Sequence, residues 1–353
     1  MFFRCRCFLF TLLFLTLTGC ASLNVSTLKD YPPQDNDTFY IKGLPFVRQS
    51  YFYCGPASLE AVLRYWGEDI NQQGIAQAIY LGKAKGTFNF EMVDFCQRKR
   101  FFTKDFSGTI EDMKFYIRKN IPVIALHKKR VLFSDYHYVV IIGINEKNGY
   151  LVINDGYREN VKISFDHFSK NWKEANNWML VIVPPERVDF IKEPNEYNRL
   201  GILLEEKGNL YSAKKHYLKA IGLNNSQALI YFNLANVYLK EKKFDKAIEN
   251  YEKAIKLSPD FADCYNNLAY ALAEGGFSLK EAEEMIKKAI EINPEGKFWY
   301  GDTLGLINLK QGRFNEAIIN FEESIRSSSG ETKNLNMVYK HLIESYIMLG
   351  LNR

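Results

Sequence analysis

The second half of the chain repeats itself at a nearly constant interval, which restricts its fold more than any other feature. Pairs of one leucine and one small residue recur 34, 34 and 36 residues apart: Leu200–Gly201, Leu234–Ala235, Leu268–Ala269 and Leu304–Gly305. A second series of small residues recurs at similar intervals, each followed four positions later by a large residue: Ala213, Ala247, Ala282 and Ala317. Small residues allow paired helices to approach closely. The period therefore predicts stacked helix pairs from residue 195 onward.

The repeat resembles the tetratricopeptide (TPR) family over residues 195 to about 326. The second repeat carries the family's residues at their expected spacings: Tyr231, Leu234, Ala235, Tyr238, Ala247, Tyr251, Ala254 and Pro259. The pattern departs at Gly301, where a large residue is usual. The resemblance implies an all-α TPR superhelix over residues 195–350, with about four repeats and a solvating cap from Met337 to Leu349. Its concave surface is expected to bind a peptide or protein partner, and a spacer or oligomerisation module is the alternative.

The first twenty residues have the composition of an export signal. Arg4 and Arg6 precede an apolar run that is too short to span a bilayer and that ends in Leu17, Thr18, Gly19 and Cys20. This ending resembles a bacterial lipobox. It implies cleavage before Cys20 and attachment of acyl chains such as palmitate to the new terminus.

Residues 1–20 are therefore expected to be a lipoprotein signal peptide, and residues 21–38 a tether to the membrane. Ala21, and not an aspartate, follows Cys20. In bacteria with two membranes this implies transfer to the periplasmic face of the outer membrane. An ordinary secretory signal with a coincidental cysteine is the alternative.

Composition places the rest of the chain among ordinary soluble proteins. The formal net charge of +5 is too small and too dispersed for a nucleic-acid interface. Beyond Cys20 the cysteines are Cys54, Cys96 and Cys264. Three cysteines form no disulfide framework, so at least one thiol is expected to stay free and could be the reactive one. Prolines and charges at residues 184–194 predict a linker after a first domain of residues 39–183.

Cys54 lies at the expected start of a helix and is the candidate nucleophile. Residues 49–67 read QSYFYCGPASLEAVLRYWG, with apolar residues at helical spacing from Pro56 onward. Proline suits the first turn of a helix, and the positive end of the helix dipole favours the thiolate. A small apolar cysteine capping a helix is the alternative. Gln49, five residues earlier, can join the Cys54 amide in stabilising an oxyanion.

His137 is the candidate base, and its partner depends on a predicted β-hairpin. His137 precedes a buried strand of β-branched residues, and a second strand leads to Asp155. A three-residue loop over 147–149, with Gly149 left-handed, puts His137 and Asp155 on one face, whereas a two-residue loop puts them on opposite faces. A bulge or a strand end could also restore the common face. On one face, Asp155 would hold the imidazole tautomer, and His137 would deprotonate Cys54 and protonate the leaving amine. His127 is the rival base.

The first domain resembles the bacteriocin-processing, double-glycine cysteine peptidases, in particular their free-standing lipoprotein branch with C-terminal TPR repeats. The residues that carry the resemblance are Gln49, Cys54-Gly55-Pro56, His137 and Asn154-Asp155. The resemblance covers roughly residues 40–183. It implies an α+β papain-like domain with a Cys54, His137 and Asp155 triad and Gln49 at the oxyanion hole. The glutamine stands five rather than six residues before the cysteine. Gly156 stands where many relatives have proline, which leaves Asn154 as a possible third member.

The combined features predict an envelope lipoprotein cysteine peptidase whose TPR repeats recruit its peptide or protein substrate, or another protein partner. Two alternatives remain: a non-catalytic scaffold with a degenerate papain-like domain, and a papain-like acyltransferase or amidase. The histidines lie far apart in the chain without metal-ligand spacing, and no nucleotide fingerprint is present, so we expect neither metal nor cofactor.

Overall fold

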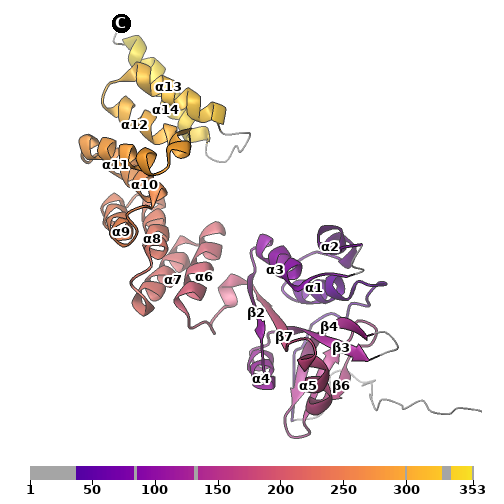
Figure 1. Cartoon of the computed structure of the whole chain (residues 1–353). Helices are drawn as coiled ribbons and strands as arrows, with labels where there is room; N and C mark the ends of the chain where they lie inside the picture. The colour runs from indigo at the N-terminus through magenta and orange to yellow at the C-terminus, as the bar shows by residue number, and fades with distance from the viewer. Residues whose placement is uncertain (1–36, 83–85, 131–133, 299, 328–334, 352–353) are drawn as a thin grey trace, which may run out of the picture. The chain divides into compact units, whose positions relative to one another are not determined.

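The computed structural model describes residues 37–82, 86–130, 134–298, 300–327 and 335–351. The expected signal peptide, Cys20 and nearly all of the expected tether lie outside these described residues. The chain folds into two compact units, one formed by residues up to 182 and one formed by residues from 183 onward together with the short segment 96–102. The first unit contains both strands and helices, and helices follow in the second (Figure 1), which confirms the expected fold class.

One sheet organises the first unit. Its order is β2-β7-β3-β4-β5-β6, and β1 also pairs with β4. The long strand β4 therefore lies inside the sheet, antiparallel to β1, β3 and β5. Every side chain of β7 is buried, as expected for an apolar run of the sequence WMLVIV. The strands are β1 (Thr38–Tyr40), β2 (Phe102–Ser107), β3 (Val123–Arg130), β4 (Ser134–Asn145), β5 (Tyr150–Asn154), β6 (Val161–Ser164) and β7 (Trp178–Val183).

Three of the helices described in the first unit, α1, α4 and α5, pack on this sheet. Helix α1 packs against β4, α4 contacts β1, β3 and β4, and α5 contacts β3 and β6. The predicted helix that starts near Cys54 agrees with α1. The helices are α1 (Cys54–Tyr65), α2 (Gln72–Ile79), α3 (Asn89–Arg98), α4 (Ile110–Arg118) and α5 (Phe165–Lys173).

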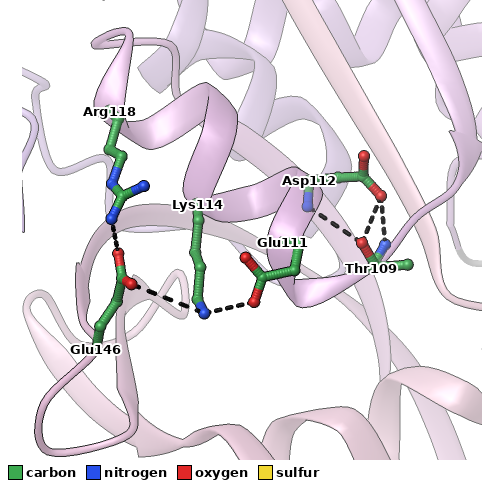
Figure 2. Close-up of polar contacts among 6 residues, drawn as sticks. All are labelled: Thr109, Glu111, Asp112, Lys114, Arg118 and Glu146. Atoms are coloured by element: carbon green, nitrogen blue, oxygen red, sulfur yellow. Dashed lines mark hydrogen bonds and ion pairs between the residues drawn. The ribbon is translucent and has the colours of Figure 1, made fainter.

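Helix α4 is tied to the loop that joins β4 and β5. Thr109 and Asp112 form a capping box at its start, in which each side chain accepts a hydrogen bond from the other residue's backbone amide (Figure 2). At its other end, Arg118 and Lys114 form ion pairs with Glu146, a residue of the β4–β5 loop. These contacts hold the hairpin that carries two candidate site residues.

In its described residues, the second unit consists of four helix pairs followed by one more helix. The glycines of the repeated pairs explain the close packing: a Cβ at Gly201 would lie 2.5 Å from the Tyr217 ring, and one at Gly305 would lie 2.7 Å from the Phe321 ring. The helices are α6 (Pro194–Glu206), α7 (Leu210–Leu223), α8 (Ala228–Lys240), α9 (Phe244–Leu257), α10 (Ala262–Glu274), α11 (Leu279–Ile292), α12 (Gly301–Lys310), α13 (Phe314–Ser327) and α14 (Leu335–Leu351); the short 3₁₀ turns are η1 (Pro185–Arg187) and η2 (Pro294–Phe298).

The last helix, α14, differs from the expected solvating cap. It buries Val338, His341 and Ser345 against the preceding pair, but its outer face exposes Ile343, Ile347 and other apolar side chains. Its surface is therefore less polar than a solvating cap requires. Among the described residues, no helix is both long and apolar enough to cross a bilayer.

Candidate active site

Cys54 is the first residue of α1, as the sequence predicts. No acidic side chain lies in the first turn of this helix, so nothing there offsets the positive end of the helix dipole. Cys54 is partly exposed, whereas Cys96 and Cys264 are completely buried. Burial raises the pKa of the Cys96 thiol, and burial together with the charge of Asp263 raises the pKa of Cys264 to about 12. Of these three thiols, Cys54 has the environment of a nucleophile.

Cys54 begins α1, which packs on β4. Burial raises the pKa of the Tyr138 phenol, and the negative charge of the Cys54 thiolate raises it further. Tyr138 is next to His137 in β4, and its hydroxyl donates to Asn89 Oδ1 at 2.6 Å. A Cβ at Gly55 would also lie 3.1 Å from Thr87 Cβ, so the segment before α3 borders the nucleophile.

His137 is held by a main-chain carbonyl. Its Nε2 lies 2.7 Å from the backbone oxygen of Asp155, and both residues are buried. Because a carbonyl only accepts hydrogen bonds, Nε2 carries the proton in the neutral ring. Nδ1 is then the nitrogen that can accept a proton.

The hairpin register brings His137 and Asp155 together through a bulge, in place of the expected three-residue loop. The loop between Asn145 and Tyr150 has four residues, with Gly149 in the expected left-handed conformation at φ 67°. A four-residue loop alone would place His137 and Asp155 on opposite faces. A register shift between Ile141 and Gly143 adds one residue to β4 and restores the common face.

The carboxylate of Asp155 faces Arg158 instead of His137. Asp155 Oδ2 accepts from Arg158 Nε at 3.0 Å and from the guanidinium Nη2 at 2.7 Å. Asp155 Oδ1 accepts from the backbone amides of Tyr157 and Arg158. Burial raises the pKa of the carboxyl, but these hydrogen bonds and the Arg158 charge more than offset it, so the pKa lies below its ordinary value. The geometry therefore gives the side chain a different contact from the one expected for a triad.

Gln49 is buried and held on three sides. Its backbone amide donates to the carbonyl of Gly156 at 2.8 Å. The side chain of Gln72 brackets it, since Oε1 accepts from the Ser50 amide and Nε2 donates to the Arg48 carbonyl. Gln49 Nε2 donates to the Tyr157 hydroxyl at 3.0 Å.

The Asp155-Gly156-Tyr157 turn fits closely around this glutamine. Gly156 has φ 79°, and a Cβ there would lie 2.2 Å from Gln49 Oε1. Proline, with φ near −65°, cannot adopt this conformation. The departure from the family pattern at Gly156 is thus coupled to the position of Gln49.

His127, the rival base, and Asn154, the possible third member of the triad, make other contacts. His127 pairs directly with His137 across β3 and β4, with ring centroids 6.1 Å apart, and its ring stacks on Phe168. Asn154 Oδ1 accepts from the Asn160 amide at 3.1 Å, within the turn before β6. Within the described parts of the chain, no group of three or more histidine, cysteine or acidic side chains could hold a metal ion.

Three contributors to the site were missed by sequence reasoning. Tyr157 and Arg158 follow Asp155 directly, so their proximity was visible, but no pattern indicated which way their side chains point. Gln72 begins α2 and contacts the Gln49 segment only through the tertiary fold. Buried Glu60 in α1 supports it, because Glu60 Oε2 accepts from the Gln72 amide at 2.6 Å.

Comparison with known proteins supports the two-part organisation of the chain. Residues 41–179 match the Peptidase_C39 like family, and residues 197–227, 228–261 and 250–284 match tetratricopeptide repeat models. The first unit is therefore a C39-like peptidase domain. The chain joins this domain to a C-terminal array of TPR repeats, as its sequence predicts.

The curated relatives match through the repeats. A TPR repeat-containing protein of Methanocaldococcus jannaschii is 32% identical over 158 residues, which cover 43% of this chain and 25% of that protein. The mitochondrial import receptor subunit TOM70 of Rattus norvegicus is 33% identical over 97 residues, which cover 28% of this chain and 16% of that protein. The chain thus spans a quarter or less of the length of these relatives.

Solved structures resemble each half of the chain separately. A protein from Bacillus anthracis described as a C39-like peptidase covers 41% of this chain and 97% of its own, with 16% identity and a TM-score of 0.37. A thermophilic TPR protein from Thermus thermophilus covers 44% of this chain and 83% of its own, with 21% identity and a TM-score of 0.38.

Proposed function

We propose that this chain is an envelope lipoprotein cysteine peptidase in which Cys54 attacks the peptide carbonyl and His137 is the base. The observation that carries the proposal is the 2.7 Å contact between His137 Nε2 and the Asp155 carbonyl, which leaves Nδ1 as the proton acceptor. The thiol that would give up its proton, Cys54, begins helix α1. His137 takes the Cys54 proton and later gives it to the leaving amine. Water then hydrolyses the resulting thioester.

Two groups are available to stabilise the oxyanion that forms during attack. The first is the backbone amide of Cys54 at the start of α1, where the helix dipole adds to its effect. The second is Gln49 Nε2, which has two hydrogens and gives one of them to Tyr157. Gln72 and Gly156 hold the backbone at Gln49, and the Tyr157 hydroxyl orients its side-chain amide before substrate binds.

Thiol reactivity tests this proposal. We would treat the chain beginning at Ala21 with a thiol-directed probe and compare it with Cys54→Ala, His137→Ala and the matched control Cys96→Ala. We expect labelling at Cys54 that persists at mildly acidic pH, is unchanged in Cys96→Ala and falls at least about 100-fold in His137→Ala. Labelling of Cys54 at the rate of an ordinary thiol, regardless of residue 137, would refute the proposal.

The contact between Asp155 and Arg158 favours a second candidate, a non-catalytic scaffold. In a degenerate triad the carboxylate would pair with another group instead of the histidine, as Asp155 pairs with Arg158. The same reactivity measurement separates the two candidates, because a scaffold has no need of an activated thiol. An amidase or acyltransferase would share the reactive Cys54, so profiling with peptides and with other acyl donors decides between reaction types.

The repeats and the signal segment complete the proposal. TPR arrays mediate protein–protein interaction, and we propose that this one recruits the peptidase substrate or a protein partner. Side-chain amides link successive repeats along the first helices, with Asn233 donating to Asn198 and Asn267 donating to Asn236.

We also propose lipidation of Cys20 and location at the periplasmic face of the outer membrane. Palmitate labelling and membrane fractionation of wild type and Cys20→Ala test this; labelling that survives the substitution would refute it.

A further inference from the structure

We propose that Tyr157 is a positioning residue that fixes the His137 imidazole and the Gln49 amide at the same time. The proposal rests on the peptidase function proposed above and adds a residue outside the Cys54, His137, Asp155 and Gln49 set. Three independent contacts carry it.

The first contact is with the base. The Tyr157 ring lies parallel to the His137 ring, with an angle of 8° between the planes and 6.1 Å between the centroids. This separation is within the range of offset aromatic pairs, about 4.5–7 Å. The Asp155 carbonyl holds the imidazole at Nε2. The parallel Tyr157 ring restricts tilting of the imidazole plane as well.

The second contact is with the oxyanion donor. The Tyr157 hydroxyl accepts a hydrogen bond from Gln49 Nε2 at 3.0 Å. Gln49 Oε1 is buried and has no hydrogen-bond partner among the described residues. The amide is therefore oriented through its nitrogen by Tyr157. Without the hydroxyl, nothing else among the described side chains determines which way the Gln49 amide turns.

The third contact fixes Tyr157 itself. Its backbone amide donates to Asp155 Oδ1 at 3.0 Å, and Arg158 holds the other oxygen of that carboxylate. The side chain of Asp155 thus shapes the turn that presents Tyr157, while the carbonyl of Asp155 holds His137. One residue anchors both the base and the side chain that covers it.

Two substitutions separate the contributions of the ring and the hydroxyl. Tyr157→Phe keeps the ring and removes the hydroxyl, whereas Tyr157→Leu removes both. Tyr136→Phe is the matched control, because Tyr136 also neighbours His137 and is half-exposed, but its hydroxyl donates to the Glu174 carbonyl at 3.2 Å. The measurements are kcat and KM on a peptide substrate found by profiling, and the titration midpoint of the His137 imidazole by NMR.

We expect Tyr157→Phe to lower kcat about tenfold with KM nearly unchanged, since the Gln49 amide acts on the oxyanion and not on bound substrate. The His137 midpoint should not move. Tyr157→Leu should lower kcat further and move the His137 midpoint by about half a pH unit, because the imidazole loses the ring that covers it. Tyr136→Phe should match wild type in all three quantities.

A merely structural role would lower the stability of the Tyr157 variants without these selective changes. Wild-type values of kcat and of the His137 midpoint in both Tyr157 variants would overturn the proposal. If the wild-type protein shows no turnover, the peptidase function fails, but the NMR titration still decides the proposal. A shifted midpoint in Tyr157→Leu alone would then support the positioning of His137, and an unshifted midpoint would overturn it.

Discussion

His137 and Asp155 are joined through the backbone of Asp155: the imidazole Nε2 lies 2.7 Å from its carbonyl oxygen, while its carboxylate binds Arg158. A carbonyl can fix the tautomer of the base as a carboxylate does, but it supplies no full negative charge to stabilise the imidazolium that forms during catalysis. Substitution of the Asp155 side chain leaves this acceptor in place.

Asp155→Asn should therefore affect thiol reactivity much less than loss of the base. We expect labelling of Cys54 to fall less than about tenfold in Asp155→Asn and at least about 100-fold in His137→Ala. The rate of labelling by a thiol-directed probe measures both. Equal losses in the two variants would show that the carboxylate reaches His137 in the reactive conformation.

The Asp155–Arg158 pair should make stability depend on pH in the acid range. The pKa of Asp155 is lowered in the folded state, so its stabilisation is complete above the ordinary value of about 3.9 and is lost as pH falls through the lower, folded value. Since Arg158 is 47% exposed, we expect Arg158→Met to cost only about 1 kcal/mol at pH 7. Urea unfolding at pH 7 and near pH 2 measures this; a difference from wild type that persists at the lower pH would contradict the assignment.

Gly156→Ala should displace Gln49 as well as strain the backbone. An alanine at φ 79° is strained, and its Cβ would lie 2.2 Å from Gln49 Oε1. Because backbone strain and the steric clash add, we expect about 2–4 kcal/mol lower stability with loss of turnover. Gly149→Ala is the matched control, because its φ is 67° but its nearest neighbour would be Phe165 at 3.9 Å. Thermal unfolding and peptide hydrolysis should separate the two variants. Equal turnover in both would show that Gln49 does not need its present position.

Cys96 and Cys264 should stay unreactive until the protein unfolds. Both thiols are completely buried with raised pKa values, so neither is exposed nor ionised at neutral pH. In the chain beginning at Ala21, mass spectrometry should find one modified cysteine under native conditions and three in urea. Rapid native modification of Cys264 would mean that the repeats open locally.

Gly305→Ala should destabilise the repeats, because the new Cβ would lie 2.7 Å from the Phe321 ring. We expect a cost of about 1–3 kcal/mol, typical of overpacking. Gly222→Ala is the control, since no atom lies within 4 Å of its Cβ position in α7, and it should be neutral or slightly stabilising. Calorimetry of the full chain measures both, and equal melting temperatures would contradict the close packing.

The sequence by itself determined the helical repeats and the place of the nucleophile. Each TPR helix packs mainly on its neighbours in the chain, so spacings such as Leu234 to Leu268 carry the packing information locally. The start of α1 at Cys54 follows in the same way from Pro56 and the helical pattern after it. These features depend on short-range periodicity, which a sequence displays directly.

Only the tertiary structure decided how the other site residues meet. A single inserted residue between Ile141 and Gly143 determines whether His137 and Asp155 share a face, because strand side chains alternate with a period of two. Whether the carboxylate or the carbonyl of Asp155 meets the imidazole depends on the turn that Arg158 stabilises, and the role of Tyr157 depends on that same turn. Hydrogen bonds across distant segments select this geometry, and no periodic pattern in the sequence records them.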